Sequence, residues 1–183
     1  MKTDIIFCGV GGQGILSVAT IIGQAATACG LHLKQAEVHG MSQRGGDVQS
    51  HMRISSDTVW SDLIPLAGAD LVISMEPLEV LRYLPWMSPS CAVVSASEPF
   101  INIPSYPSAE ELGKLLEAVP GLRLVDIGKD RSANMVLLGA AAKSLSGIPA
   151  EALREAIRTV FAAKGDSVVA ANIEAFDKGY DME

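Results

Sequence analysis

Metal-binding cysteine patterns are missing from this 183-residue chain. Its three cysteines, Cys8, Cys29 and Cys91, are widely spaced, and none belongs to a Cys-x-x-Cys pair. Structural zinc sites and iron–sulfur clusters use closely spaced thiolate ligands. We therefore predict that this chain carries no cofactor and no metal of its own, and that the three thiols are buried among apolar neighbours.

Clusters of basic residues are absent too, and the net charge is −7. Proteins that bind nucleic acids neutralise phosphates with grouped Lys and Arg, so no nucleic-acid partner is expected. The sequence has no run of about 18 apolar residues, so no membrane-spanning helix is expected. Residues 1–4 lead into an apolar segment without the pattern of a signal peptide. The sequence predicts a cytoplasmic protein that does not associate with a membrane.

Internal repeats, low-complexity tracts and linkers are not found either, so a single domain over residues 1–183 is expected. Apolar residues make up 49% and charged residues 19%, which is a globular balance. No Ser-His-Asp or Cys-His arrangement is evident. The chain therefore lacks a recognisable catalytic apparatus of its own.

Apolar periodicity predicts alternating strands and helices. The expected strands are residues 5–8, 31–37, 48–54, 58–60, 69–74, 91–95 and 122–127. The expected helices are residues 15–29, 76–84, 108–118, 133–145, 149–163 and 167–178, the third beginning with a capping box at Ser108 and Glu111. This order predicts an α/β, Rossmann-like fold with a mostly parallel sheet, helices on both faces, and a local antiparallel portion within residues 31–60.

A glycine-rich turn follows the first expected strand. Its residues of interest are Gly9, Gly11, Gly12, Gln13 and Gly14. Their Gly-x-Gly-x-x-Gly spacing between a strand and a helix is typical of dinucleotide binding, where the helix N-terminus receives a phosphate. Glu37, after the second strand, is placed to contact a ribose, but a loop and a strand follow it in place of a crossover helix. The alternative is a tight turn that packs closely or faces a partner protein.

The loop after the second expected strand concentrates functional side chains. It comprises Glu37, Val38, His39, Gly40, Met41, Ser42, Gln43, Arg44, Gly45 and Gly46. Its glycines permit a close approach of the backbone to another molecule. We interpret the loop as a contact surface for a ligand or a partner protein.

The histidines and arginines in and around this loop each have two interpretations. His39 and His51 could form an acid/base pair, or bind a metal with Glu37, although no metalloenzyme spacing is matched. Arg44 and Arg53 suit recognition of a carboxylate or phosphate through paired hydrogen bonds. Equally, each could form an ion pair with Glu37, Asp47 or an acid of a partner.

Three features lie farther along the chain. Glu76 follows a strand, at the edge where ligands bind, but is better explained as an acid favoured by a helix dipole. Asn134 is expected to cap the helix that it begins. The small residues 139–142 are expected to let two helices approach closely.

The glycine-rich turn, the loop at 37–46 and the following Ser50-His-x-Arg53 resemble the gamma-type domain of 2-oxoacid:ferredoxin oxidoreductases, in particular the beta subunits of indolepyruvate oxidoreductases. Further matching segments are residues 63–65, 70–79, 134–139, 172–176 and 179–180. The resemblance covers about residues 5–180, and the segment 95–108 matches less well.

The resemblance implies a subunit of an enzyme that oxidatively decarboxylates an aryl 2-oxoacid with coenzyme A (CoA), forming an acyl-CoA and reducing ferredoxin. It implies that thiamine diphosphate, magnesium and the 4Fe-4S clusters reside in a large alpha subunit, in an alpha2beta2 heteromer, and that the isolated chain is inactive. Residues 9–14 and 40–46 would then shape the subunit interface, and Arg44 or Arg53 could reach an anionic group. The alternatives are an independent NAD(P)-binding oxidoreductase and a purely structural scaffold subunit.

Overall fold

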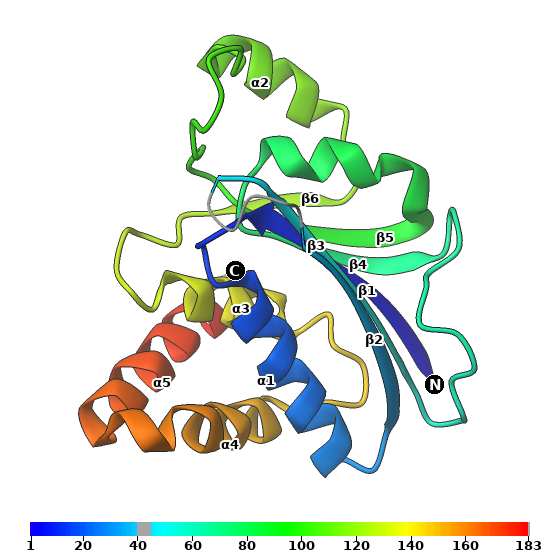
Figure 1. Cartoon of the computed structure of the whole chain (residues 1–183), viewed down its shortest axis with the longest axis vertical. Coiled ribbons are helices and arrows are strands. Elements are labelled where there is room, and N and C mark those ends of the chain that lie inside the picture. Colours follow the sequence, from blue (N-terminus) through cyan, green and yellow to red (C-terminus); the bar gives the residue numbers. More distant parts are fainter. Residues whose placement is uncertain (40–44, 183) are drawn as a thin grey trace.

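Six strands form one mixed sheet in the computed structural model, which describes residues 1–39, apart from the side chain of His39, and residues 45–182 (Figure 1). The strands are β1 Lys2–Val10, β2 His32–His39, β3 Asp47–Ser55, β4 Ala69–Ser74, β5 Met87–Ala96 and β6 Leu122–Val125. Their order in the sheet is β2-β3-β1-β4-β5-β6. β1, β4, β5 and β6 are parallel, and β3 is antiparallel to both β1 and β2. The fold class and its antiparallel portion are confirmed.

Helices cover both faces of the sheet (Figure 1). One face carries α1 Ile15–Ala28, α3 Ala133–Ala142, α4 Ala150–Phe161 and α5 Asp166–Tyr180, with the short 3₁₀ helix η2 Ala162–Lys164 between the last two. The other carries the 3₁₀ helix η1 Leu78–Trp86 and α2 Ala109–Glu117. Each face therefore has its own layer of helices.

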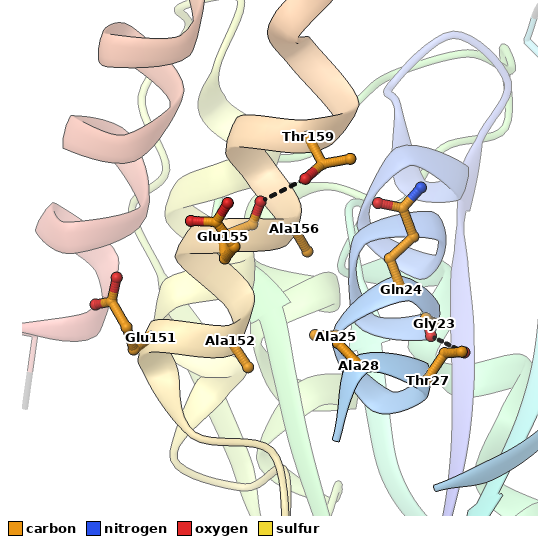
Figure 2. A pocket seen from close by; sticks show the side chains of 10 residues that line it. All are labelled: Gly23, Gln24, Ala25, Thr27, Ala28, Glu151, Ala152, Glu155, Ala156 and Thr159. Atoms are coloured by element: carbon orange, nitrogen blue, oxygen red, sulfur yellow. Dashed lines mark hydrogen bonds between the residues drawn. The ribbon is translucent and has the colours of Figure 1, made fainter. Parts of the chain in front are cut away.

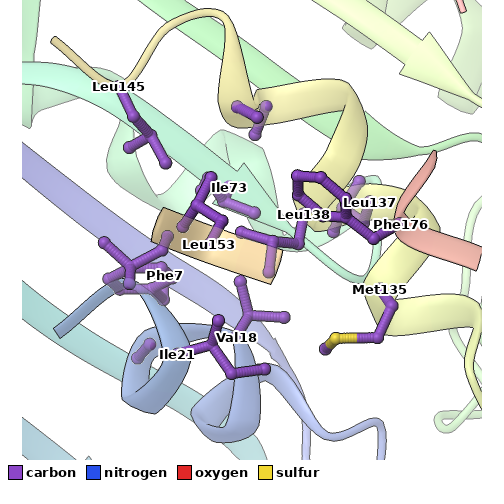
Figure 3. Packing of buried hydrophobic residues seen from close by; sticks show 14 of the residues in the cluster. Phe7, Val18, Ile21, Ile73, Met135, Leu137, Leu138, Leu145, Leu153 and Phe176 are labelled. Carbon is purple, nitrogen blue, oxygen red and sulfur yellow. The ribbon is translucent and has the colours of Figure 1, made fainter. Parts of the chain in front are cut away.

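Alternation along the strands supplies both layers of the core. Phe7 and Ile73 point toward the four-helix side and pack in one cluster with Met135 and Phe176 (Figure 3). Their neighbours Ile6 and Val72 belong to the cluster on the opposite side. β1 is buried on both faces because it lies in the middle of the sheet.

Two expected elements differ in kind from the prediction, and β1 and β5 begin three and four residues before their expected starts. Residues 58–60 form no strand. The segment is held by side chains instead, since Lys34 Nζ donates to the Trp60 carbonyl at 3.2 Å and Arg53 Nη1 to the Leu63 carbonyl at 3.3 Å. The helix expected at 76–84 is η1, a 3₁₀ helix that contains Pro85, which has no N–H for an α-helical hydrogen bond.

The small residues at 139–142 allow the close helix contact that the sequence predicts. α3 and α5 meet backbone to backbone, Gly139 against the carbonyl of Phe176 and Gly179 against that of Val136. A Cβ on Gly139 would also lie 2.7 Å from the nitrogen of Tyr180. Glycine is required at both positions because the obstacles are main-chain atoms, which cannot rotate away.

We predict that Gly139→Ala destabilises the chain by about 2 kcal/mol, because overpacking forces α3 and α5 apart. The matched control is Gly113→Ala in α2, where an added Cβ meets nothing within 4 Å. Removing a glycine from a helix interior there should stabilise by about 0.5–1 kcal/mol. Urea unfolding followed by circular dichroism measures both. Equal midpoints for the two variants would contradict the packing argument.

Candidate functional site

The two glycine-rich segments lie side by side. The antiparallel register of β1 and β3 pairs Val10 with Asp47, so the chain leaves β1 where it enters β3. The Gly11 N–H donates to the Gly46 carbonyl at 2.8 Å, and the Gly45 N–H to the Gly11 carbonyl at 3.5 Å. Residues 40–44, which include Gly40, Met41, Ser42, Gln43 and Arg44, lie outside the described residues.

Gln13 braces the turn internally. Its Oε1 accepts from the Val10 N–H at 2.7 Å, and its Nε2 donates to the Met75 carbonyl at 3.1 Å. A Cβ on Gly9 would come within 3.0 Å of Gln13 Oε1. The amide therefore joins the carboxyl ends of β1 and β4, and both its polar atoms are engaged within the chain.

Gly14 links the turn to α3. Its φ of 79° is left-handed, and a Cβ there would lie 2.9 Å from Asn134 Nδ2. This nitrogen donates to the Gly14 carbonyl at 3.1 Å. The expected capping role of Asn134 is therefore wrong: its amide holds the N-termini of α1 and α3 together, a contact that depends on the tertiary fold.

A cavity of about 970 Å³ opens at this edge of the sheet. It lies at the carboxyl ends of β1, β4, β5 and β6, where open α/β sheets bind ligands. Its walls include Gly12, Gln13, Gly14, Ser17, Met75, Glu98, Phe100, Lys129, Asp130, Arg131, Ser132, Asn134, Lys164, Ser167 and Asn172. The turn is thus part of the cavity wall.

The cavity wall has a small excess of positive charge. The N-termini of α1 and α3 both border it, and neither helix has an acid in its first turn. Lys129 is paired with Glu98 at 3.1 Å, and of the remaining charged residues Asp130 is negative while Arg131 and Lys164 are positive. Unpaired N–H groups of helix N-termini together with cationic side chains bind phosphates.

Sequence reasoning missed most of these cavity residues. Lys129 and Arg131 follow β6, and Glu98 follows β5, so the carboxyl-edge rule could have indicated them. Lys164 gives no local signal, because it reaches the cavity only through the packing of η2 and α5.

His51 lies away from the cavity, in a buried site on β3. Its Nδ1 accepts from the Ile64 N–H at 3.2 Å, and its ring meets the edge of Trp86 with centroids 6.4 Å apart. In the register of β2 and β3, His51 lies opposite Ala36, and His39 lies opposite Val48. The two histidines are therefore three positions apart along the strands, which is about 10 Å. The backbone gives an acid/base pair of His39 and His51 no support. Burial lowers the pKa of His51, although Asp4 and Asp62 oppose the shift.

Arg53 forms an ion pair, as one of the two interpretations predicts, but with Asp4 and not with Glu37 or Asp47. Arg53 Nε and Nη2 contact the two carboxylate oxygens of Asp4 at 2.9 and 3.2 Å. The Asp4 side chain is fully buried. Arg53 is also absent from the cavity wall. Its planar guanidinium is thus engaged in a bidentate contact with Asp4 inside the chain.

Glu37 does not lie beside the glycine-rich turn. β3 separates β2 from β1, and the register runs from Glu37 to Ser50 and on to Phe7. Glu37 accepts from Gln35 Nε2 at 2.7 Å. In a dinucleotide-binding fold the acidic strand is the direct neighbour of the first strand, so this strand order removes the support for a ribose contact.

Glu76 has a larger role than the helix dipole suggests. It is 1% exposed, and its Oε2 accepts from the Glu79 N–H at 2.9 Å, in the first turn of η1. Its Oε1 accepts from the Phe100 N–H at 3.4 Å and from the Tyr106 hydroxyl. One buried carboxylate therefore fastens the segment after β5 to the end of β4.

The environments of the three cysteines differ in burial. Cys8 and Cys91 are buried as predicted, and burial raises the pKa of Cys8 to about 12 and that of Cys91 to about 11. For Cys29 the prediction of burial is wrong, since this residue is half-buried at the end of α1. Within residues 1–39 and 45–182, no three His, Cys, Asp or Glu side chains gather as a metal site.

A second cavity, of about 730 Å³, lies between α1 and α4 and contains none of the predicted site residues (Figure 2). Glycine, alanine and threonine line most of it. Its two acids, Glu151 and Glu155, pair with Arg158 at 3.1 and 3.0 Å.

In the part of the chain that the structure describes, no helix is long and apolar enough to cross a membrane.

Comparison with known proteins finds relatives over almost the whole chain. The family model for pyruvate ferredoxin/flavodoxin oxidoreductase matches residues 4–182. Indolepyruvate oxidoreductase subunit IorB of Methanothermobacter thermautotrophicus is 38% identical, over 98% of this chain and 97% of its own. IorB of Pyrococcus horikoshii is 35% identical, over 96% and 93% respectively.

Solved structures share the fold. A 2-oxoglutarate:ferredoxin oxidoreductase from Magnetococcus marinus with 2-oxoglutarate, CoA and succinyl-CoA bound superposes with a TM-score of 0.76 at 24% identity, over 98% of this chain and 30% of the longer one. Pyruvate oxidoreductase subunit PORC from Thermotoga maritima gives a TM-score of 0.72 at 20% identity, over 98% and 96%.

We predict that Arg53→Met lowers the free energy of unfolding by about 2 kcal/mol, because the buried Asp4 carboxylate loses its two hydrogen bonds to the guanidinium and keeps only Lys2 Nζ, at 2.8 Å, as an ionic partner. Replacing Asp4 by leucine in the same chain should recover part of the loss. Arg158→Ala, which breaks ion pairs on the surface, is the control and should have little effect. Urea titration compares the variants, and a loss no greater than that of the control would exclude a structural role for the pair.

We predict that His51 makes the chain less stable as the pH falls below about 6.5, the value for an unperturbed histidine. Its pKa is lower in the folded state, so the unfolded state takes up the proton first and stability rises with pH. Burial raises the pKa of Glu79, which acts in the opposite direction.

The measurement is therefore the difference between the chain and His51→Gln in unfolding midpoint from pH 7.5 to 5. The original chain should lose more stability than the variant. His32→Gln controls for the loss of an exposed histidine. Parallel curves for the chain and His51→Gln would contradict the prediction.

Proposed function

The chain belongs to the pyruvate ferredoxin/flavodoxin oxidoreductase family, and on this premise we propose that it is the small subunit of a 2-oxoacid:ferredoxin oxidoreductase acting on an aryl 2-oxoacid such as indolepyruvate. The reaction joins the acyl group left by decarboxylation to CoA, releases carbon dioxide and passes two electrons to ferredoxin. Nearly full-length similarity to two IorB subunits supports the aryl substrate.

The partner in this proposal is a large alpha subunit that carries thiamine diphosphate, magnesium and 4Fe-4S clusters, with two copies of each chain in an alpha2beta2 assembly. Thiamine diphosphate supplies the carbanion chemistry of decarboxylation. The cysteines of this chain do not fit a cluster, because no three potential ligands gather among the described residues and burial raises the pKa values of Cys8 and Cys91. Its own residues would bind and orient, and the isolated chain would be inactive.

The joined glycine-rich segments carry the proposal. Gly11 and Gly46 have no side chains and are hydrogen-bonded to each other, next to Gly12 of the cavity wall, so a partner's surface could approach the backbone closely there. Residues 9–14 and 40–46 would therefore form the subunit contact, and Arg44 would reach an anionic group or an acid of the partner. His51 and Arg53 would support β3 behind this surface.

The cavity beside this contact would bind the phosphate groups of CoA. The N-termini of α1 and α3 and the side chains of Arg131 and Lys164 provide the donors and the positive charge. The 2-oxoglutarate:ferredoxin oxidoreductase from Magnetococcus marinus, which shares this fold, has CoA bound. Bound there, the phosphates would hold CoA in place while its thiol end extends toward the cofactor of the large subunit.

The two alternative functions, an independent NAD(P) enzyme and a pure scaffold subunit, require different features of the chain. An independent NAD(P) enzyme would need an acid beside the glycine-rich turn, and Glu37 is one strand too far away. Titration of the isolated chain with NADH, with fluorescence enhancement as the signal, tests it directly. A pure scaffold would leave the kinetic constants unchanged when cavity residues are replaced.

We predict that Arg131→Ala and Arg44→Ala in the reconstituted complex each raise the KM for CoA about tenfold, since a charge-assisted hydrogen bond contributes about 1.5 kcal/mol. The KM for the 2-oxoacid should stay unchanged if the group bound is a CoA phosphate. Lys178→Ala, an exposed lysine of α5 outside the cavity, is the control. Unchanged assembly and unchanged constants for both arginine variants would refute this use of the cavity and the loop.

A further inference from the structure

The irregular segment of residues 97–107, here called the strap, is fixed at several points although it has no regular secondary structure. Phe100 and Tyr106 both donate to one carboxylate oxygen of the buried Glu76. Between them, the Tyr106 N–H donates to the Ile103 carbonyl at 3.2 Å. Burial and the hydrogen bond to Glu76 raise the pKa of Tyr106. The strap therefore has a defined conformation in the free chain.

The strap is joined directly to the glycine-rich loop. Asn102 Nδ2 donates to the Gly45 carbonyl at 2.9 Å. Gly45 and Gly46 are in turn bonded to Gly11 in the turn after β1. Turn, loop end and strap thus form one continuous stretch of surface, and Glu98 and Phe100 of the strap also line the cavity.

Apolar side chains project from the strap into solvent. Phe100 is 46% exposed, Ile101 75% and Ile103 43%. The only charged residue of the strap is Glu98, which is paired with Lys129. Single exposed apolar residues are ordinary, but three within four positions on an anchored, otherwise uncharged segment indicate a contact surface.

We propose that the strap is part of the docking surface for the large, cofactor-bearing subunit, and that it contacts an apolar, uncharged area of that subunit. The proposal rests on the proposed function. The strap is hydrogen-bonded to residues of the proposed subunit contact, since Asn102 contacts Gly45, and Gly45 and Gly46 contact Gly11, and this continuity favours the large subunit over a second copy of the chain. Docking on the strap brings the large subunit beside the cavity, where the two active-site halves must meet.

Glu76 acts in this arrangement as a positioning residue. It contacts no partner, since it is 1% exposed, yet it holds both Phe100 and Tyr106. A surface ordered before binding loses less conformational entropy on association, which increases affinity. The exposed apolar residues of the strap would thus make the contact, and the buried Glu76 would hold the strap in the conformation that makes it.

A second exposed apolar group provides the matched control. Trp60 is 86% exposed and Leu63 58%, on the segment between β3 and β4. That segment precedes β4, at the opposite edge of the sheet from the strap. Substitution at Trp60 removes more apolar surface than substitution at Ile101, so a nonspecific loss of apolar area would have its larger effect there.

The experiment measures the dissociation constant between the full chain and the large subunit of the same oxidoreductase, by biolayer interferometry on the purified proteins. Ile101→Ser should raise the dissociation constant at least tenfold, and Asn102→Ala should raise it severalfold by releasing the strap from Gly45. Trp60→Ser should leave it within twofold. Thermal unfolding confirms that each variant is folded.

Each result decides the matter. Wild-type affinity in Ile101→Ser, or an equal loss in Trp60→Ser, overturns the strap proposal while the proposed function stands. Loss of self-association in Ile101→Ser, with unchanged affinity for the large subunit, overturns it in favour of contact between copies. If the unaltered chain itself does not bind the large subunit, the proposed function fails first.

Discussion

The antiparallel pairing of β3 with β1 is the constraint on which the site depends. It inserts β3 between β1 and β2, and it brings the end of the glycine-rich loop to the turn after β1. A glycine fingerprint that elsewhere accompanies a dinucleotide is thereby separated from the acid that would hold the ribose. The same pairing brings Gly11 and Gly46 together, joined by a backbone hydrogen bond. One reversed strand thus removes the support for a dinucleotide site and places the turn beside the loop that we propose as a subunit contact.

The opposite side of the cavity depends on helix packing. Gly139 and Gly179 let α3 and α5 touch through their backbones, and Asn134 ties the start of α3 to Gly14 at the start of α1. Two helix N-termini consequently border one cavity. Small residues that look like plain core packing therefore also determine where the positive ends of the helix dipoles lie. Stability and the placement of the two helix N-termini rely on the same contacts here.

Local signals predicted much of the fold, and distant contacts account for the failures. The capping box of Ser108 and Glu111 needs only four residues, and both of its hydrogen bonds are present. Apolar periodicity likewise predicted α1 within one residue. The partner of Arg53 could not be found this way, because Asp4 becomes its neighbour only through the strand order. Lys164 and Asn134 reach their positions through helix packing, which no sequence spacing records. Composition alone singles out the loop at residues 37–46, and its role as a contact surface stays a prediction.

The three prolines of the strap affect the unfolded chain as well as the folded one. Pro99, Pro104 and Pro107 restrict the backbone before folding, so fixing this segment costs less conformational entropy than its lack of regular structure suggests. A contact surface that is already ordered needs no folding step at the moment of encounter. The rate of association is then set by diffusion and by the orientation of two formed surfaces. Assembly of the enzyme would be governed by the concentrations of its chains and by how quickly the contact dissociates.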